Sequence, residues 1–345
     1  MVEVPTISLL FTLFLVLVAE FFNGWTDAPN AVAAAVATRV LPPDKAIWIA
    51  AGANLLGLLP ALIIGAEVAK TVGTGIVRPD VISLEAIDAA MLAIIAWAGL
   101  SAYIGLPVSK SHATVAALLG VGFAIGGFDA LLGAGWIKVA KGVGIAIFLG
   151  VSLAWIATKL VKTAGWHKSI SNERWTLYQQ ITVVLVSMCH GFGDGLKFVG
   201  VFTLVLVLGG QLPAFVVQPW VIILCAACMG AGTLCGGRRI IKRLDTMVNS
   251  RKDDDEDGGH GVSYKPYQGV CTELTAAILI GTAAVMGFPM STTHTVVSGA
   301  VGAKAAVKWK KVDWPTARIV LGGWILTIIV CPIIAYLFVN LIQLL

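Results

Sequence analysis

Two aspartates, Asp27 and Asp194, stand inside apolar segments of the chain, where a charge is costly. Carboxylates in such surroundings usually face a cavity and mark the path of an ion or a proton. Thr26 and Asn30, close to Asp27, add neutral oxygens of the kind that Na⁺ takes. The sequence therefore predicts a coupling-cation site built from Asp27, Thr26, Asn30 and Asp194. The alternative is that each carboxylate lies near the membrane interface and pairs with backbone donors.

A lysine and three histidines accompany these carboxylates. Lys197 follows Asp194 by three residues, about one helical turn, so it either pairs with Asp194 or contacts an anion directly. His112, His190 and His294 are candidates for carrying a proton or for a structural hydrogen bond. We do not expect His112 or His294 to bind a metal, because no Cys or second His accompanies either at ligand spacing.

Two similar octapeptides, GLPVSKSH (Gly105 to His112) and GFPMSTTH (Gly287 to His294), interrupt two other apolar runs. In each, a Gly and a Pro break a helix and small hydroxyl residues cap a new one. A helix starting at Pro107 or Pro289 would leave its first amide groups unpaired beside those hydroxyls, which together suit a tetrahedral oxyanion. The candidate anion contacts are Ser109, Lys110, Ser111, Ser291, Thr292, Thr293 and Lys197. The alternative is that the hydroxyls only cap their own helices.

The composition assigns the chain to the membrane. Of its 345 residues, 58% are hydrophobic and only 12% are charged, whereas soluble domains have about 25% charged residues. The net charge of +5 comes from basic loops and reports topology rather than a nucleic-acid partner. Cys225 and Cys228 form a CxxC within an apolar span without a second pair, which favours buried packing over redox or metal chemistry.

The elements that must position these residues are long helices. The apolar runs at about 5–40 and 175–210 are interrupted by NGWTDAPNA and HGFGDGLKFVG, so we expect a broken helix at each. Further spans are expected at 46–69, 89–128, 142–158, 213–235, 267–303 and 319–345. The sequence thus predicts an all-α polytopic protein.

The basic segments at 159–174, 236–252 and 304–318 predict the topology. All three favour the cytoplasm, so the segment containing GFPMSTTH enters and leaves on one face, either as a re-entrant hairpin or as two crossings. Counting back, residues 1–160 and 175–345 form two repeats of inverted topology, joined by a cytoplasmic linker at 161–174. The stretch 236–266 is expected to be an extended cytoplasmic loop.

With these motifs in place, the whole chain resembles the inorganic phosphate transporter (Pit) family. That family's signatures read approximately NG-x-x-D-x-x-NA, HG-x-ND and P-x-S-[ST]-[ST]-H, and PMSTTH at Pro289 is a full match. The resemblance implies an inverted-repeat phosphate carrier driven by Na⁺ or protons. It implies cation coordination, including Na⁺, at Asp27, Asn30 and Asp194, and anion contacts at Ser109, Ser111, Ser291, Thr292 and Thr293.

Two residues depart from the family pattern. Gly193 stands where an Asn is usual, which removes a side-chain oxygen from the expected cation site, and Lys110 stands where a small hydroxyl residue is usual. Because a fixed positive charge at Lys110 could replace a cation, we expect fewer coupling sodium ions, or none, and chiefly proton coupling.

These observations predict a multi-pass protein of the cell membrane, with no cofactor, that takes up inorganic phosphate with H⁺ or Na⁺ by alternating access. Its expected partners are phosphate, the lipid bilayer and a second copy in a homodimer, with no nucleic acid. The alternative is a carrier of another tetrahedral oxyanion such as sulfate. An intramembrane enzyme using Asp27, Asp194 and the histidines as acid and base groups is disfavoured because the sequence shows no nucleophile–base pair or metal-ligand cluster at usable spacing. A passive channel is disfavoured by the inverted repeat with two tips at its centre.

Overall fold

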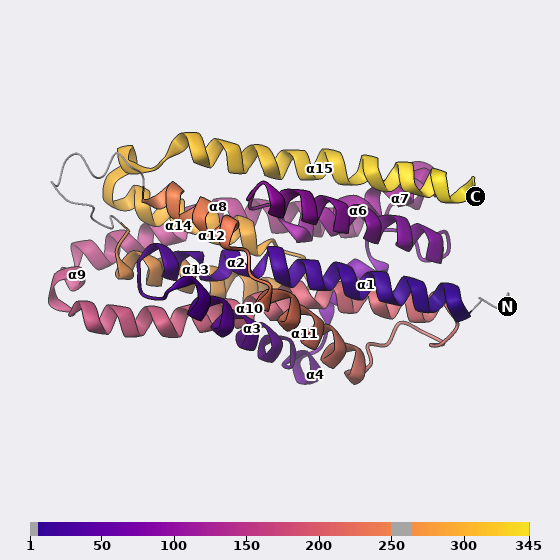
Figure 1. The fold of residues 1–345 in the computed structure, drawn as a ribbon, viewed down its shortest axis with the longest axis horizontal. Helices are drawn as coiled ribbons and strands as arrows, with labels where there is room; N and C mark the ends of the chain where they lie inside the picture. The colour runs from indigo at the N-terminus through magenta and orange to yellow at the C-terminus, as the bar shows by residue number, and fades with distance from the viewer. Residues whose placement is uncertain (1–5, 250–263, 345) are drawn as a thin grey trace.

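The computed structural model describes residues 6–249 and 264–344, which are helical almost throughout (Figure 1). The helices up to residue 163 are α1 (Thr6–Thr26), α2 (Ala28–Ala37), α3 (Pro43–Leu58), α4 (Ala61–Ile64), α5 (Glu67–Thr74), α6 (Leu84–Tyr103), α7 (Lys110–Gly126), η1 (Gly127–Ala130) and α8 (Gly133–Thr163). The later helices are α9 (Trp166–Ser169), α10 (Asn172–Leu208), α11 (Pro219–Leu234), α12 (Arg238–Val248), α13 (Pro266–Val285), α14 (Thr292–Lys308), η3 (Trp309–Lys311) and α15 (Trp314–Gln343).

Within the described ranges, eight helices are long and apolar enough to cross a membrane. They differ in how far they are enclosed by the rest of the protein. In the most apolar window of α10, 89% of the residues are buried, whereas in that of α15 only 22% are. Since lipid is the natural neighbour of an exposed apolar helix, α10 lies at the centre and α15 at the periphery. The all-helical polytopic fold is confirmed.

Two helical hairpins, α6–α7 and α13–α14, point toward each other from opposite ends of the molecule (Figure 1). At their turns Gly105 and Gly287 have φ of 67° and 72°, which glycine adopts without strain. The tips meet, because the Ser111 hydroxyl donates a 3.2 Å hydrogen bond to the carbonyl of Met290. Of the two alternatives that the sequence left open, the structure has the re-entrant arrangement.

The helix carrying Asp27 is interrupted, but only locally. α1 ends at Thr26 and α2 begins at Ala28, while the N–H of Asp27 still bonds to the carbonyl of Asn23 at 2.8 Å. Pro29, which has no N–H and blocks the preceding turn, explains the interruption. The second predicted break is wrong: α10 continues for 37 residues through the glycine-rich motif around Asp194, where no proline stops it.

The expected extended loop at 236–266 is also wrong in its first part. Residues 238–248 form α12, which is bent by 68° from α11 and buries Ile240, Ile241 and Leu244. These apolar residues recur at helical spacing among the arginines and lysines, so the segment is an amphipathic helix rather than a solvated loop. Arg39 on the loop after α2 pairs with Asp245 of α12 at 3.1 Å. The acidic run Asp253 to Asp257 lies outside the described residues.

The helices pack in matching pairs. α1 packs against α11 and α6, and α10 packs correspondingly against α3 and α13; α7 packs against α15, and α14 against α8. Glycines allow the backbones to touch. A Cβ on Gly24 would lie 2.1 Å from the carbonyl oxygen of Met229, and one on Gly191 would lie 2.2 Å from that of Asn54. Small residues at such crossings are typical of membrane helices, and here they bring α1 against α11 and α10 against α3.

Candidate functional site

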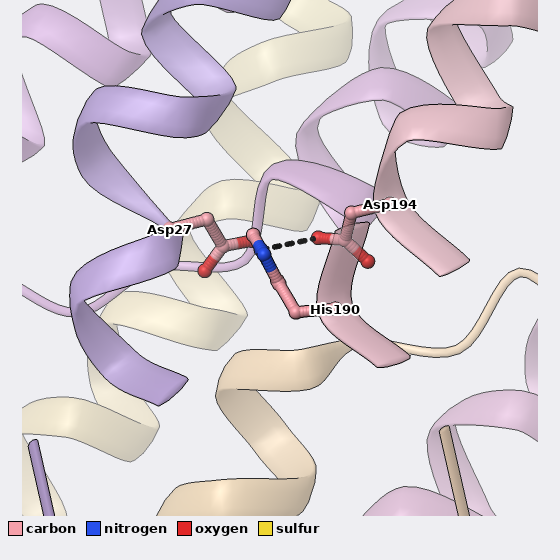
Figure 2. A group of neighbouring side chains, drawn as sticks. All are labelled: Asp27, His190 and Asp194. Atoms are coloured by element: carbon pink, nitrogen blue, oxygen red, sulfur yellow. Dashed lines mark ion pairs between the residues drawn. The ribbon is translucent and has the colours of Figure 1, made fainter. Parts of the chain in front are cut away.

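Three buried side chains from two helices meet at the centre of the protein. Figure 2 shows Asp27, at the interruption between α1 and α2, facing His190 and Asp194 of α10. Nε2 of His190 lies 3.5 Å from Oδ2 of Asp194, and potential ligand atoms of the three residues lie within 4.8 Å of one another. Each residue is at most 1% exposed. The sequence prediction that Asp27 and Asp194 face a common interior site therefore agrees with their positions.

Asp27 is held by groups from the neighbouring turn and from both hairpin tips. Its Oδ1 accepts hydrogen bonds from Nδ2 of Asn30 at 2.9 Å and from the hydroxyl of Thr293. Its Oδ2 accepts from the backbone N–H of Lys110 at 3.3 Å. Asn30 also donates to Thr293 at 3.0 Å. The hydroxyl of Thr26 instead donates to the carbonyl of Phe22 in its own helix.

Asp194 has a different set of partners. Its Oδ1 pairs with the ammonium group of Lys197, which also donates to the Ser111 hydroxyl and to the Met290 carbonyl. The hydroxyls of Ser111 and Thr292 lie 3.5 and 3.4 Å from the same oxygen. Of the two roles expected for Lys197, pairing with Asp194 is the one in this structure.

The first serine of each tip caps its helix. Ser109 and Ser291 are the N-caps of α7 and α14, and each hydroxyl accepts a 3.2 Å bond from the N–H of the histidine three residues on. Both helices therefore begin three residues later than predicted, because the serine side chain, rather than the proline, closes the first turn. For Ser109 and Ser291, the structure therefore agrees with the alternative that the tip hydroxyls cap their own helices.

Lys110 binds Asp27 through its backbone N–H, whereas its ammonium group has other hydrogen-bond partners. Its ammonium group is 3.4 Å from the Ser101 hydroxyl and 3.5 Å from the Val108 carbonyl, and the residue is only 1% exposed. Gly193 was expected to mark a lost ligand of the cation site. A Cβ at this position would instead lie 3.1 Å from Cγ2 of Ile280 on α13. Neither departure makes a side-chain hydrogen bond to a carboxylate, but the charge of Lys110 still attracts Asp27 and Asp194 through the interior.

The tip histidines contact each other between the two hairpins. The rings of His112 and His294 are 4.2 Å apart, and His294 also lies 3.7 Å from the ring of Trp324 on α15. Nδ1 of His294 lies 2.6 Å from the hydroxyl of Ser291, and Trp324 donates a 3.0 Å bond to the Pro107 carbonyl. These contacts join the two hairpin tips to each other and to α15.

Asn54 on α3 is a site residue that the sequence reasoning missed. Its Oδ1 lies 2.9 Å from Nδ1 of His190 and accepts a hydrogen bond from that N–H, while Nε2 of His190 faces Asp194. A lone Asn in an apolar span was the available signal. Glu273, which the sequence could not place, accepts bonds from Gln179 at 3.1 Å and Thr182 at 2.6 Å.

Of the buried polar atoms of Asp27, Asn30, His190 and Asp194, three have no hydrogen-bond partner among the residues that the structure describes. They are Oδ1 of Asn30, Nε2 of His190 and Oδ2 of Asp194. Buried polar atoms are nearly always satisfied, so each such atom calls for an explanation. A cation or a proton held between the two carboxylates would satisfy oxygen and nitrogen acceptors of this kind.

The fold and the site together define a polytopic helical membrane protein in which two re-entrant tips meet at buried carboxylates. A family model described as the phosphate transporter family matches residues 23–335. The chain belongs to this family, which confirms the resemblance found in the sequence.

Two curated relatives and one solved structure are similar over nearly the whole chain. A probable low-affinity inorganic phosphate transporter of Bacillus subtilis (strain 168) is 33% identical, covering 97% of this chain and 99% of that protein. One from Rhizobium meliloti (strain 1021), with the same description, is 32% identical over 92% and 91%. A structure titled "The sodium-dependent phosphate transporter" has a TM-score of 0.76 at 18% identity, covering 99% and 100%, which shows a shared fold.

Proposed function

We propose that this protein takes up inorganic phosphate together with a coupling cation, H⁺ or Na⁺, by alternating access. The observation that carries the proposal is the meeting of two hairpin tips, rich in hydroxyls and helix N-termini, at two buried carboxylates. Membership of the phosphate transporter family and the relatives described as phosphate transporters support it. They also support transport rather than catalysis as the protein's activity.

The anion is expected to bind between the tips. α7 and α14 both begin there, so the positive ends of two helix dipoles converge on the same place. Hydroxyl donors are added by Ser111, Thr292 and Thr293. In this structure these hydroxyls contact the carboxylates of Asp27 and Asp194. A tetrahedral oxyanion would take these hydroxyls once the carboxylates are neutralised by a cation or proton. Ser109, Ser291 and Lys110 would support the tips rather than contact the anion first.

Alternating access would use the two halves, 1–160 and 175–345, as inverted repeats joined by the linker at 161–174. The equivalent packing of α1 with α11 and of α10 with α3 supports this division. So does the approach of the two hairpins from opposite ends (Figure 1). Movement of one hairpin relative to the helices around it would open the site to one side at a time.

The proposal is tested with the purified protein in proteoliposomes. Uptake of labelled phosphate and labelled sulfate is measured while a Na⁺ gradient or a proton gradient is imposed separately. We expect phosphate to accumulate with at least one of the two gradients, and unlabelled sulfate to compete poorly. Sulfate uptake faster than phosphate uptake would assign the carrier to the alternative anion, and equal rates with and without gradients would indicate a channel.

Two adjacent residues of the second tip should respond differently to substitution. Thr292→Ala removes a hydroxyl that does not cap the helix, so we expect phosphate affinity to fall about tenfold or more, as for a lost hydrogen bond to a charged group. Ser291→Ala removes the cap of α14 and should mainly lower the free energy of unfolding, by about 1 kcal/mol. Phosphate binding and thermal unfolding of each variant measure this. Equal losses of affinity and stability in both variants would favour capping as the only role of the tip hydroxyls.

A further inference from the structure

We propose that the ammonium group of Lys197 is a tethered cation that takes the place of a free coupling cation in the Asp194 half of the site. The proposal rests on the proposed function, because it concerns how many free cations accompany the substrate. It assigns to Lys197 the role that Lys110 was expected to have from the sequence.

The surroundings of Lys197 are those of a small coordinated cation. Its ammonium group has three donors, and three acceptors surround it: Oδ1 of Asp194, the hydroxyl of Ser111 and the carbonyl of Met290. These come from three separate elements, namely α10, the first turn of α7 and the tip before α14. A carboxylate, a hydroxyl and a carbonyl freed at a break in a helix are also the ligands that membrane carriers offer to Na⁺.

The residues around Asp27 are arranged like those around Asp194, but a neutral side chain takes the place of the lysine. Asn30 follows Asp27 by three residues, as Lys197 follows Asp194. Thr293 of the second tip donates to Asp27, as Ser111 of the first tip lies against Asp194. At the position equivalent to Lys197, Asn30 binds the carboxylate and the tip hydroxyl through a neutral amide.

The positive charges of the site are therefore distributed unequally. Lys197 is ion-paired with Asp194, whereas the ammonium group of Lys110 hydrogen-bonds to Ser101 and Val108 and acts on Asp27 only through space. In the described ranges no Lys or Arg side chain lies within ion-pair distance of Asp27. A free cation beside Asp194 would meet the lysine charge at close range in a dry interior, where like charges repel strongly. The repulsion leaves the Asp27 half for a free cation, which would bind there with the unpartnered Oδ1 of Asn30 and face the unpartnered Oδ2 of Asp194 across the site.

The test is a Na⁺ titration of the full-length purified protein, without phosphate, at constant ionic strength with choline replacing Na⁺. The readout is the midpoint of thermal unfolding, since an ion that binds the folded state raises it. Lys197→Asn copies Asn30 and should create a second Na⁺ site, seen as a new saturable rise in Tm of about 3 °C or more. Lys197→Gln, with the same amide on a longer side chain, is a second variant should the first not fold.

Three further variants, all of which keep Lys197, show whether a change in the Na⁺ response is specific to this lysine. Lys138→Asn removes a lysine that contacts only the Thr71 hydroxyl on α5, and should leave the Na⁺ response unchanged. In the presence of Lys197, Asp27→Asn should remove any Na⁺ response of the protein, whereas Asp194→Asn should not. Folded Lys197 variants with the wild-type Na⁺ response would overturn the proposal, and so would a wild-type response that depends on Asp194.

The same variants in proteoliposomes separate this proposal from the proposed function. Lys197→Asn should raise the Hill coefficient of Na⁺ for phosphate uptake by about one. Absence of phosphate uptake by the wild-type protein would contradict the proposed function, while the Na⁺ titration, done without phosphate, would still decide the role of Lys197.

Discussion

Asp27→Asn should reduce gradient-driven phosphate uptake to the level of empty liposomes while the protein still inserts and folds. The substitution keeps the volume of the side chain and removes the negative charge that would offset a bound cation. No Lys or Arg among the described residues forms an ion pair with Asp27. The buried ammonium group of Lys110 loses its electrostatic attraction to this carboxylate, so we expect a loss of stability that is smaller than for a broken ion pair. Labelled phosphate uptake and the thermal unfolding midpoint of the same preparation measure the two effects.

Asp245→Asn is a suitable control for this prediction. Asp245 pairs with Arg39 near the surface, and such pairs contribute about 1 kcal/mol or less, so uptake should be close to that of the wild type. Asp194→Asn should also abolish uptake, but it leaves the Lys197 charge buried without its partner and should lower the free energy of unfolding by about 3–5 kcal/mol. Full gradient-driven uptake by the Asp27 variant would mean that this carboxylate is structural.

Gly191→Ala should lower the free energy of unfolding strongly, because the added methyl group has no room beside the site. A Cβ at this position would lie 2.2 Å from the carbonyl oxygen and 2.8 Å from the Cα of Asn54, so α3 and α10 would have to move apart. The separation would also stretch the 2.9 Å contact between Asn54 and His190. Overpacking of this kind costs about 3 kcal/mol, at the upper end of the usual range.

A glycine of α3 is the matched control. No neighbouring atom lies within 4 Å of the position that a Cβ on Gly52 would take, so Gly52→Ala should be neutral or stabilise the helix by about 0.5–1 kcal/mol. Thermal unfolding and the yield of monodisperse protein after size-exclusion chromatography compare the two variants. Similar unfolding midpoints for both would show that the helices α3 and α10 can separate at little cost.

The helical architecture followed from the sequence because its causes are local or compositional. Long apolar runs, paired Gly-Pro interruptions and clusters of basic residues were sufficient to predict the spans and the two hairpins. The continuity of α10 was not predictable in this way. The glycines around Asp194 suggest a break, but they are sites of close packing: Gly191 and Gly200 meet a neighbouring backbone, and Gly193 and Gly195 meet side chains. Only tertiary packing shows the difference. In α12 the many arginines concealed the helical spacing of Ile240, Ile241 and Leu244.

The candidate site was predictable in its members but not in its pairings. Asp27 and Asp194 were identifiable because a carboxylate in an apolar segment is unusual, and the tips because they are duplicated. Which lysine meets which carboxylate depends on contacts across the two halves. Lys110, next to the carboxylate by its backbone N–H, directs its ammonium group toward Ser101, whereas Lys197 reaches the opposite tip. Asn54 was missed because its partner, His190, is 136 positions away in sequence.

The three bonds that hold the ammonium group of Lys197 set a limit on how steep a phosphate gradient the carrier can maintain. A cation that is part of the protein returns with it at the end of each cycle, so it draws no energy from the membrane potential. Moving one free charge through 100 mV yields about 2.3 kcal/mol, and a tenfold concentration ratio requires about 1.4 kcal/mol. Each free cation replaced by Lys197 therefore lowers the highest attainable ratio of internal to external phosphate by about 40-fold at that potential. The same replacement lets the cycle run without waiting for that ion to bind, which suits uptake from surroundings where phosphate is plentiful.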